Sequence, residues 1–178
     1  MTESGIPAPG APSPCVLVGV KPQQKDVVIL VAAKLAALFG VTLICAHVDT
    51  SRFPIRELPD GTFESEPIDP DLADDPDDFD PQLRDHILAL VPADLSVDFR
   101  QLAGDTSIAL REEAEILNAE VIVVGSRAGG LRANIQDFLG TSVAVHLAHR
   151  QWRPVVVVPT SPTAPDRPLP WERAASQA

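Results

Sequence analysis

The feature that most constrains the fold is an unbroken run of β-branched residues, Val121–Val124, that ends abruptly at Gly125. Such a run predicts a parallel strand that is buried on both faces of a sheet. A glycine-rich loop follows, and Gly140, Thr141 and Ser142 then open a segment with helical spacing. Backbone N–H groups and the positive end of a helix dipole converge where strand, glycine loop and helix start meet, so this order predicts an anion site.

Further apolar runs predict strands at 15–20, 41–48, 95–102 and 155–158. Segments with helical spacing lie between them, at 25–39, 81–91, 106–117 and 140–150. Strands that alternate with helices predict an α/β fold, a single doubly wound domain with a mostly parallel five-stranded sheet. Ligands of such sheets bind beyond the carboxyl ends of the strands, at a switch point. Those ends include Val20-Lys21 and Gly125-Ser126.

Two of these helices carry start signals. Asp80 precedes Pro81, which suits a first helical position, and Gly104-Asp105-Thr106 precedes the next helix. The face at helical spacing in that later helix is expected to contain Ile108, Ala109, Glu112, Ile116 and Leu117.

Charge is concentrated in one part of the 178-residue chain. The formal net charge is −11, and the window 49–85 holds thirteen acidic and three basic residues, so it alone contributes −10. We expect an acidic insertion at about 50–79, with a short hairpin around Asp60-Gly61, and tails at 1–14 (disordered) and 160–178 (Pro-rich) that flank a domain at 15–159. Nucleic-acid and anionic membrane partners are therefore not expected.

Other motifs predict neither catalysis nor a metal site. His146 and His149 lie three apart without a third ligand at a suitable spacing, and the acidic stretch 69–80 does not have the glycine and glutamate of a calcium loop. Ser126 is not part of a nucleophile elbow. Cys15 and Cys45 lie in apolar runs and predict buried thiols in a reducing compartment. No signal peptide or membrane helix is predicted, and we expect a cytoplasmic protein that is not an enzyme.

The stretch from Val121 to Pro159 resembles the C-terminal signature of the universal stress proteins. The shared pieces are VVGSR, which contains the end of the strand and the start of the loop, a Gly-Thr pair that opens the last helix and a final valine strand that is followed by proline. The likeness extends over 15–159, with CVLVGV as first strand, AHVD at the end of the second and LAGDTSIAL before the third helix. It implies an adenine nucleotide alpha hydrolase-like, Rossmann-like domain that acts in stress response.

Nucleotide-binding members of that family carry Gly-x2-Gly-x9-Gly-Ser/Thr, and only part of this pattern is present. Gly140-Thr141 follows Gly130 by nine intervening residues, but Ala128 or Arg127 stands where the remaining glycine belongs. Either Ala128 replaces a glycine in a longer loop, or the loop has been rebuilt. A methyl group is tolerated where φ is negative but blocks close approach of a phosphate otherwise.

A second departure follows the first strand. Nucleotide-binding relatives usually have an acidic residue there that accepts hydrogen bonds from adenosine, whereas this chain has Lys21, which can only donate. A binding-deficient member is therefore favoured. The alternative is a nucleotide-dependent regulator or slow ATPase that binds ATP, ADP or AMP, with Mg²⁺ only if ATP binds. Its nucleotide site would contain Val20, Lys21, Gly125, Ser126, Arg127, Gly129, Gly130, Gly140, Thr141 and Ser142.

The final strand predicts a homodimer. This strand lies between Pro154 and Pro159, has no charge and is expected at a sheet edge, where main-chain groups invite pairing across a two-fold axis. The resemblance implies the same contact. In the alternative, the tail from Thr160 onward covers that edge. A protein partner that binds the insertion or the tail is a further expectation for a member without a ligand. The residues expected to form the dimer edge are Val155, Val156, Val157 and Val158.

Overall fold

The computed structural model describes residues 13–57, 63–69, 79–126 and 143–160. Its main sheet has five parallel strands in the order β5-β2-β1-β6-β7, which confirms the predicted α/β fold. The strands are β1 (Cys15–Val20), β2 (Thr42–Asp49), β5 (Val97–Ala103), β6 (Val121–Gly125) and β7 (Val155–Val158). The chain builds outward from β1 through β2 to β5 and then returns to add β6 and β7. The order therefore reverses between β1 and β6.

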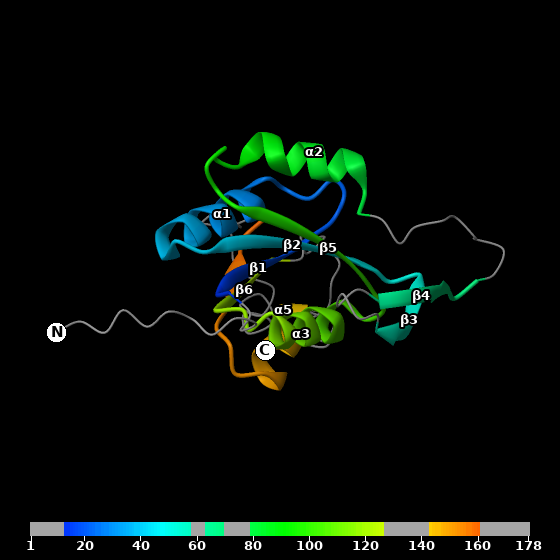
Figure 1. Cartoon of the computed structure of the whole chain (residues 1–178). Helices are drawn as coiled ribbons and strands as arrows, with labels where there is room; N and C mark the ends of the chain where they lie inside the picture. Colours follow the sequence, from blue (N-terminus) through cyan, green and yellow to red (C-terminus); the bar gives the residue numbers. More distant parts are fainter. Residues whose placement is uncertain (1–12, 58–62, 70–78, 127–142, 161–178) are drawn as a thin grey trace, which may run out of the picture.

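Helices cover both faces of this sheet (Figure 1). The helices α1 (Val27–Phe39) and α2 (Pro81–Leu90) lie on one face, and α3 (Thr106–Ile116) and α5 (Val143–Arg150) lie on the other. Two apolar cores result, because successive side chains of a strand point to opposite faces. Val16, Val18 and Val123 belong to the first core, and Leu17 and Ile122 belong to the second.

The helix boundaries follow from their caps. The carboxylates of Asp80 and Asp105 accept backbone N–H groups of the first turns of α2 and α3, as predicted. Hydrogen bonds from the Ser107 hydroxyl and from the Ile108 and Ser107 N–H groups, helped by the charge of His146, outweigh burial, so the pKa of Asp105 lies below its ordinary value. Helix α1 ends at Gly40, whose φ of +67° is the left-handed conformation that glycine adopts readily.

The segment predicted as an acidic insertion contains an antiparallel pair, β3 (Arg52–Glu57) and β4 (Phe63–Pro67), which confirms the predicted hairpin. The pair lies at the carboxyl ends of β2 and β5. The N–H of Gly104 donates to the carbonyl of Asp49 and so joins these two strand ends, and Pro54 of β3 lies next to Gly104. The buried Arg52 guanidinium donates to the hydroxyl and carbonyl oxygens of Ser65 at 2.8 and 2.6 Å. Most of the Asp-rich stretch after β4 lies outside the described residues.

One predicted helix face is wrong. In α3 the buried side chains are Ser107, Leu110, Glu113 and Ala114, whereas Ile108 and Ile116 are 43% and 42% exposed. The burial of Glu113 explains the shift, because Arg100 of β5 lies within ion-pair distance and compensates its charge.

Candidate functional site

The candidate site lies at the carboxyl ends of β1 and β6, where the strand order reverses. The strands end at Val20 and Gly125, so the predicted pairs Val20-Lys21 and Gly125-Ser126 lie at the same edge of the sheet. Such a switch point is where doubly wound sheets receive ligands. Val20 is buried and Lys21 is exposed, which leaves the backbone of the strand tips as the main source of polar contacts.

The turn after β1 forms hydrogen bonds with backbone groups at the carboxyl end of that strand. The N–H of Lys21 donates to Oε1 of Gln24 at 2.9 Å, and Nε2 of Gln24 donates to the carbonyl of Gly19 at 3.4 Å. The N–H of Gln24 also donates to the carbonyl of Lys21, which completes the turn. The Gln24 side chain thus bonds one backbone donor and one backbone acceptor at the end of β1.

The tip of β6 is fixed to the tip of β7. The N–H of Ser126 donates to the carbonyl of Val158 at 2.7 Å. The Thr160 hydroxyl donates to the carbonyl of Ser126 at 2.7 Å, and the Thr160 N–H donates to the Ser126 hydroxyl at 3.0 Å. These bonds join the ends of β6 and β7, and they occupy the first backbone donor after Gly125.

Gly125 lies next to the side chains of Gln24 and Thr160. A Cβ atom at this position would lie 3.1 Å from Cγ2 of Val28, 3.2 Å from Cγ2 of Thr160 and 3.7 Å from Nε2 of Gln24. The first two distances are tighter than most real Cβ contacts, so any larger residue here would displace Val28 or Thr160 by a few tenths of an ångström. Gln24 and Thr160 therefore flank the same point of the strand edge.

Only part of the predicted site can be located. Val20, Lys21, Gly125 and Ser126 are brought together, as described above. The other predicted residues lie outside the described residues: Arg127, Gly129, Gly130, Gly140, Thr141 and Ser142. Sequence reasoning missed Gln24 and Thr160. Their positions just after β1 and β7 are the one signal that could have found them, since polar side chains next to strand ends face the ligand edge.

The neighbouring tip of β2 presents two polar side chains. Nδ1 of His47 lies 3.0 Å from Oε1 of Gln101, and the Asp49 carboxylate accepts from both the N–H and the hydroxyl of Ser51. Burial raises the pKa of Asp49, but the Ser51 hydrogen bonds and the charges of His47 and Arg52 outweigh it, so this pKa lies below its ordinary value. Asp49 is thus a carboxylate that holds a turn, and it is poorly suited to act as a general base at neutral pH.

The described residues contain no metal-binding cluster and no activated thiol. No group of three or more His, Cys, Asp or Glu side chains there could hold a metal ion. Both cysteines are buried and free, as predicted. Burial raises the pKa of the Cys45 thiol to about 12, and burial and the charges of Glu113 and Glu120 raise the pKa of Cys15. Both thiols therefore remain protonated and are weak nucleophiles.

Strand β7 forms one edge of the sheet, as predicted. The Ile122 N–H donates to the carbonyl of Pro154 and the Ser126 N–H to that of Val158, while Val155 lies opposite Ile122. In a parallel ladder this register directs the N–H and C=O of Val155 and Val157 away from β6. Val157 is 46% exposed. Among the described helices, none is long and apolar enough to cross a membrane.

The prediction that the four valines of β7 form a dimer edge stays a prediction, and the register against β6 distinguishes the backbone groups of these valines. Val156 lies opposite Val123, and the same register directs its N–H and C=O toward β6, so these groups are used inside the sheet. Its side chain packs against the first core. Val158 is 4% exposed, and its carbonyl is held by Ser126. The backbone groups of β7 that point away from β6 therefore belong to Val155 and Val157.

Comparison with known proteins agrees with this architecture. A sequence model of the universal stress protein family matches residues 15–159. A universal stress protein solved in complex with cAMP has a similar fold, with a TM-score of 0.56, 21% identity, and coverage of 84% of this chain and 99% of that one. A universal stress protein from Archaeoglobus fulgidus has a TM-score of 0.55 and 16% identity, with coverage of 81% of this chain and 97% of that one. No curated protein matches the chain. The family match spans most of the sequence, and the chain therefore belongs to the universal stress protein family.

Proposed function

We propose that this protein acts in stress response as a homodimer that works without a bound nucleotide. The observation that carries the proposal is that backbone groups at both strand ends are already bonded, by Gln24 after β1 and by Val158 and Thr160 after β6. A nucleotide at a switch point needs backbone donors that are still available. In the part of the site that the structure describes, the N–H groups of Lys21, Ser126 and Thr160 donate within the chain, at 2.9, 2.7 and 3.0 Å. The protein would then act through protein contacts and not through catalysis.

The charge at the end of β1 supports the same proposal. Lys21 stands where nucleotide-binding relatives usually have an acidic residue, and an ammonium group cannot accept a hydrogen bond from adenosine. The Lys21 side chain is exposed and adjoins the turn that Gln24 closes. Both features act against an adenosine group at this edge.

The alternative is a protein that binds ATP, ADP or AMP. The relative solved with cAMP has a similar fold, and the 3.4 Å bond from Gln24 to Gly19 is long enough for a ligand to displace. In that case Arg127, Thr141 and the glycines between them would hold the phosphates. Mg²⁺ would enter only with ATP.

We expect ATP, ADP and AMP at millimolar concentration, with magnesium, to leave the melting temperature of the wild-type protein unchanged. A nucleotide at about 100 times its dissociation constant would add about 2.7 kcal/mol to the free energy of unfolding, a rise of about 5–10 °C for a chain of this length. Differential scanning fluorimetry measures this, together with chromatography of nucleotide released from the purified, denatured protein.

Variants make this test specific. Gln24→Ala frees the Lys21 N–H, whereas Gln82→Ala removes the same group from the exposed first turn of α2. If closure by Gln24 excludes the nucleotide, ATP raises the melting temperature of the Gln24→Ala variant and leaves that of the Gln82→Ala control unchanged. A shift in the wild type that Gly140→Val abolishes would establish the alternative.

We expect the dimer to form through β7 and to be weakened by Val157→Pro. The N–H of Val157 points away from β6, so proline leaves the sheet intact and removes one donor per copy from the edge. Two lost hydrogen bonds of about 1 kcal/mol each raise the dissociation constant roughly thirtyfold. Analytical ultracentrifugation measures the change, with Val157→Thr as a control that keeps the N–H. A wild-type protein that is monomeric at high concentration would refute the dimer.

A further inference from the structure

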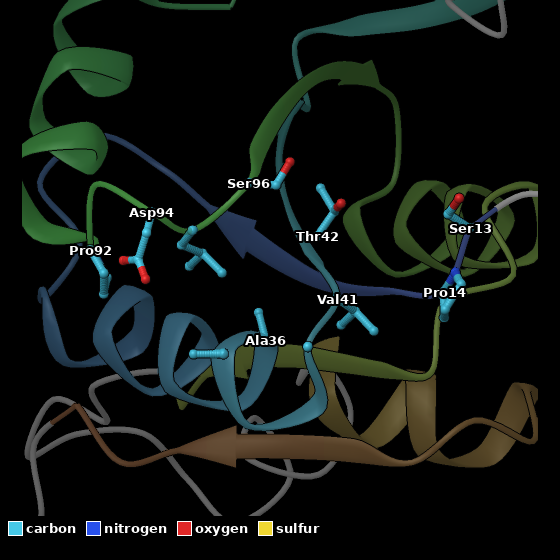
Figure 2. Close-up of a pocket in the computed structure, with 11 residues that line it drawn as sticks. Ser13, Pro14, Ala36, Val41, Thr42, Pro92, Asp94 and Ser96 are labelled. Carbon is cyan, nitrogen blue, oxygen red and sulfur yellow. The ribbon is translucent and has the colours of Figure 1, made fainter.

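A cavity of about 500 Å³ lies at the amino ends of the strands, opposite the carboxyl ends that form the candidate functional site (Figure 2). It is bounded by the residue before β1, the first residue of β2, the loop that leads into β5 and the end of α1. Its volume falls within the range of small-molecule sites in proteins. Because it lies at the amino ends of the strands, it is separate from the proposed nucleotide position, and it can be occupied or empty independently of that site.

The cavity combines apolar walls with a negative end. Ala36, Val41 and Leu95 supply apolar surface from three different segments. The exposed carboxylate of Asp94 lies among them, and within the described residues no side chain forms an ion pair with it. None of the described residues that line the cavity is a lysine, arginine or histidine.

The end of α1 adds to this negative potential. The N–H of Gly40 donates back to the carbonyls of Ala36 and Ala37, and the N–H of Val41 donates to that of Ala36 at 3.0 Å. The helix has no basic residue in its last turn. Its carboxyl end carries the negative pole of the helix dipole without a cation in its last turn, and Gly40, the residue that ends the helix, lines the cavity.

We propose that this cavity binds a small organic cation, a primary ammonium group attached to a short apolar chain. The ammonium group lies between the Asp94 carboxylate and the end of α1, and the apolar chain lies against Ala36, Val41 and Leu95. A carboxylate ligand is excluded by the same charges, and a neutral chain gains only the apolar contact. The site goes beyond the proposed function, since it needs neither the nucleotide loop nor the dimer edge.

The test is a titration of the full chain with n-hexylammonium chloride, followed by the amide signals of Gly40, Val41 and Leu95 in NMR spectra. We expect saturable shifts with a dissociation constant on the order of 1 mM. Hexanol has the same chain without charge and is expected to bind at least threefold more weakly, because it lacks the ion pair. Hexanoate is expected to give no saturable shift.

Three variants locate the binding. Asp94→Asn is expected to weaken binding of hexylammonium about three- to fivefold, the range of an exposed ion pair. Asp85→Asn removes the same charge from the exposed face of α2, away from the cavity, and should leave binding unchanged. Ala37→Leu enlarges an exposed side chain that lines the cavity and should abolish binding without lowering the melting temperature.

Three results would overturn the proposal. Hexanol that binds as tightly as hexylammonium would show an apolar groove without charge selection. Equal losses in the Asp94 and Asp85 variants would show general attraction to a protein of net charge −11. Binding that survives Ala37→Leu would place the amine elsewhere. None of these outcomes changes the expected result with ATP, so the two proposals fail separately.

Discussion

Replacement of Ile122 by alanine is expected to lower the free energy of unfolding by about 4 kcal/mol, the largest effect of any single change considered for this chain. Ile122 has no exposed surface and lies in β6, between β1 and β7. Its cross-strand partners are Leu17 and Val155. The side chain belongs to the core between the sheet and α3 and α5, where Leu110 and Leu147 are also almost fully buried.

The size of this effect follows from how little the site can relax. Deletion of buried methyl and methylene groups loses their transfer free energy and leaves a cavity. Ile122 is on a central strand whose backbone is hydrogen-bonded on both sides, so the strand cannot move inward to fill that cavity. The nearby helices are anchored by their own buried residues, Leu110 in α3 and Leu147 in α5.

Ile116→Ala is the matched control. It removes the same atoms from the last residue of α3, where the isoleucine is 42% exposed, and should cost less than about 1 kcal/mol. Urea denaturation followed by far-ultraviolet circular dichroism measures both, at one fixed protein concentration, because the stability of a dimer depends on concentration. Similar losses in the two variants would contradict the assignment of Ile122 to the core.

The sheet could be predicted from the sequence because its central strands are buried on both faces. The runs at 15–20 and 121–124 contain only apolar residues and glycine, a pattern that few other structures tolerate. Side-chain caps at Asp80 and Asp105 marked two helix starts, since their carboxylates satisfy backbone donors locally. Local chemistry of this kind can be recognised without knowledge of the tertiary contacts.

Features that depend on distant partners were not predictable in the same way. Gln24 could be interpreted only as a polar turn residue, because its approach to Gly125 joins segments far apart in the chain. The face of α3 was assigned wrongly for the same reason. Its sequence offers Ile108 and Ile116 as apolar residues, and nothing local indicates that Glu113 is buried instead. The Arg100 guanidinium on β5 lies within ion-pair distance of Glu113, and a partner on another element cannot be inferred from the sequence of α3.

The edge strand shows the same limit on a smaller scale. Four consecutive valines look alike in the sequence, so all of them were assigned to the dimer edge. The register against β6 separates them, because alternate residues of a parallel strand direct their backbone groups to opposite sides. Val156 and Val158 thus face β6, and nothing in the valine run itself indicates which two residues do so.

Arg100→Met is the second large effect, an expected loss of about 3 kcal/mol in the free energy of unfolding. Nε of Arg100 lies 3.4 Å from Oε1 of Glu113, which is only 1% exposed. The guanidinium also donates to the carbonyl of Phe99 and pairs with Asp98 at 3.3 Å. The substitution removes a positive charge next to the buried Glu113 carboxylate, and the loss of a charged partner of a buried carboxylate is costly.

The partner substitution separates charge from packing. Glu113→Gln in the Arg100→Met background is expected to recover most of the lost stability, because it removes the buried charge and keeps the shape of the side chain. Arg56→Met is the surface control: Arg56 pairs with Glu64 at 2.8 Å, but both side chains are largely exposed, so the change should stay within about 0.5 kcal/mol. Urea denaturation of the single and double variants gives the coupling energy directly. If Glu113→Gln failed to rescue Arg100→Met, the contribution of Arg100 would come from its packing and its bond to Phe99, and the ion pair would not be what allows α3 to bury a glutamate against the sheet.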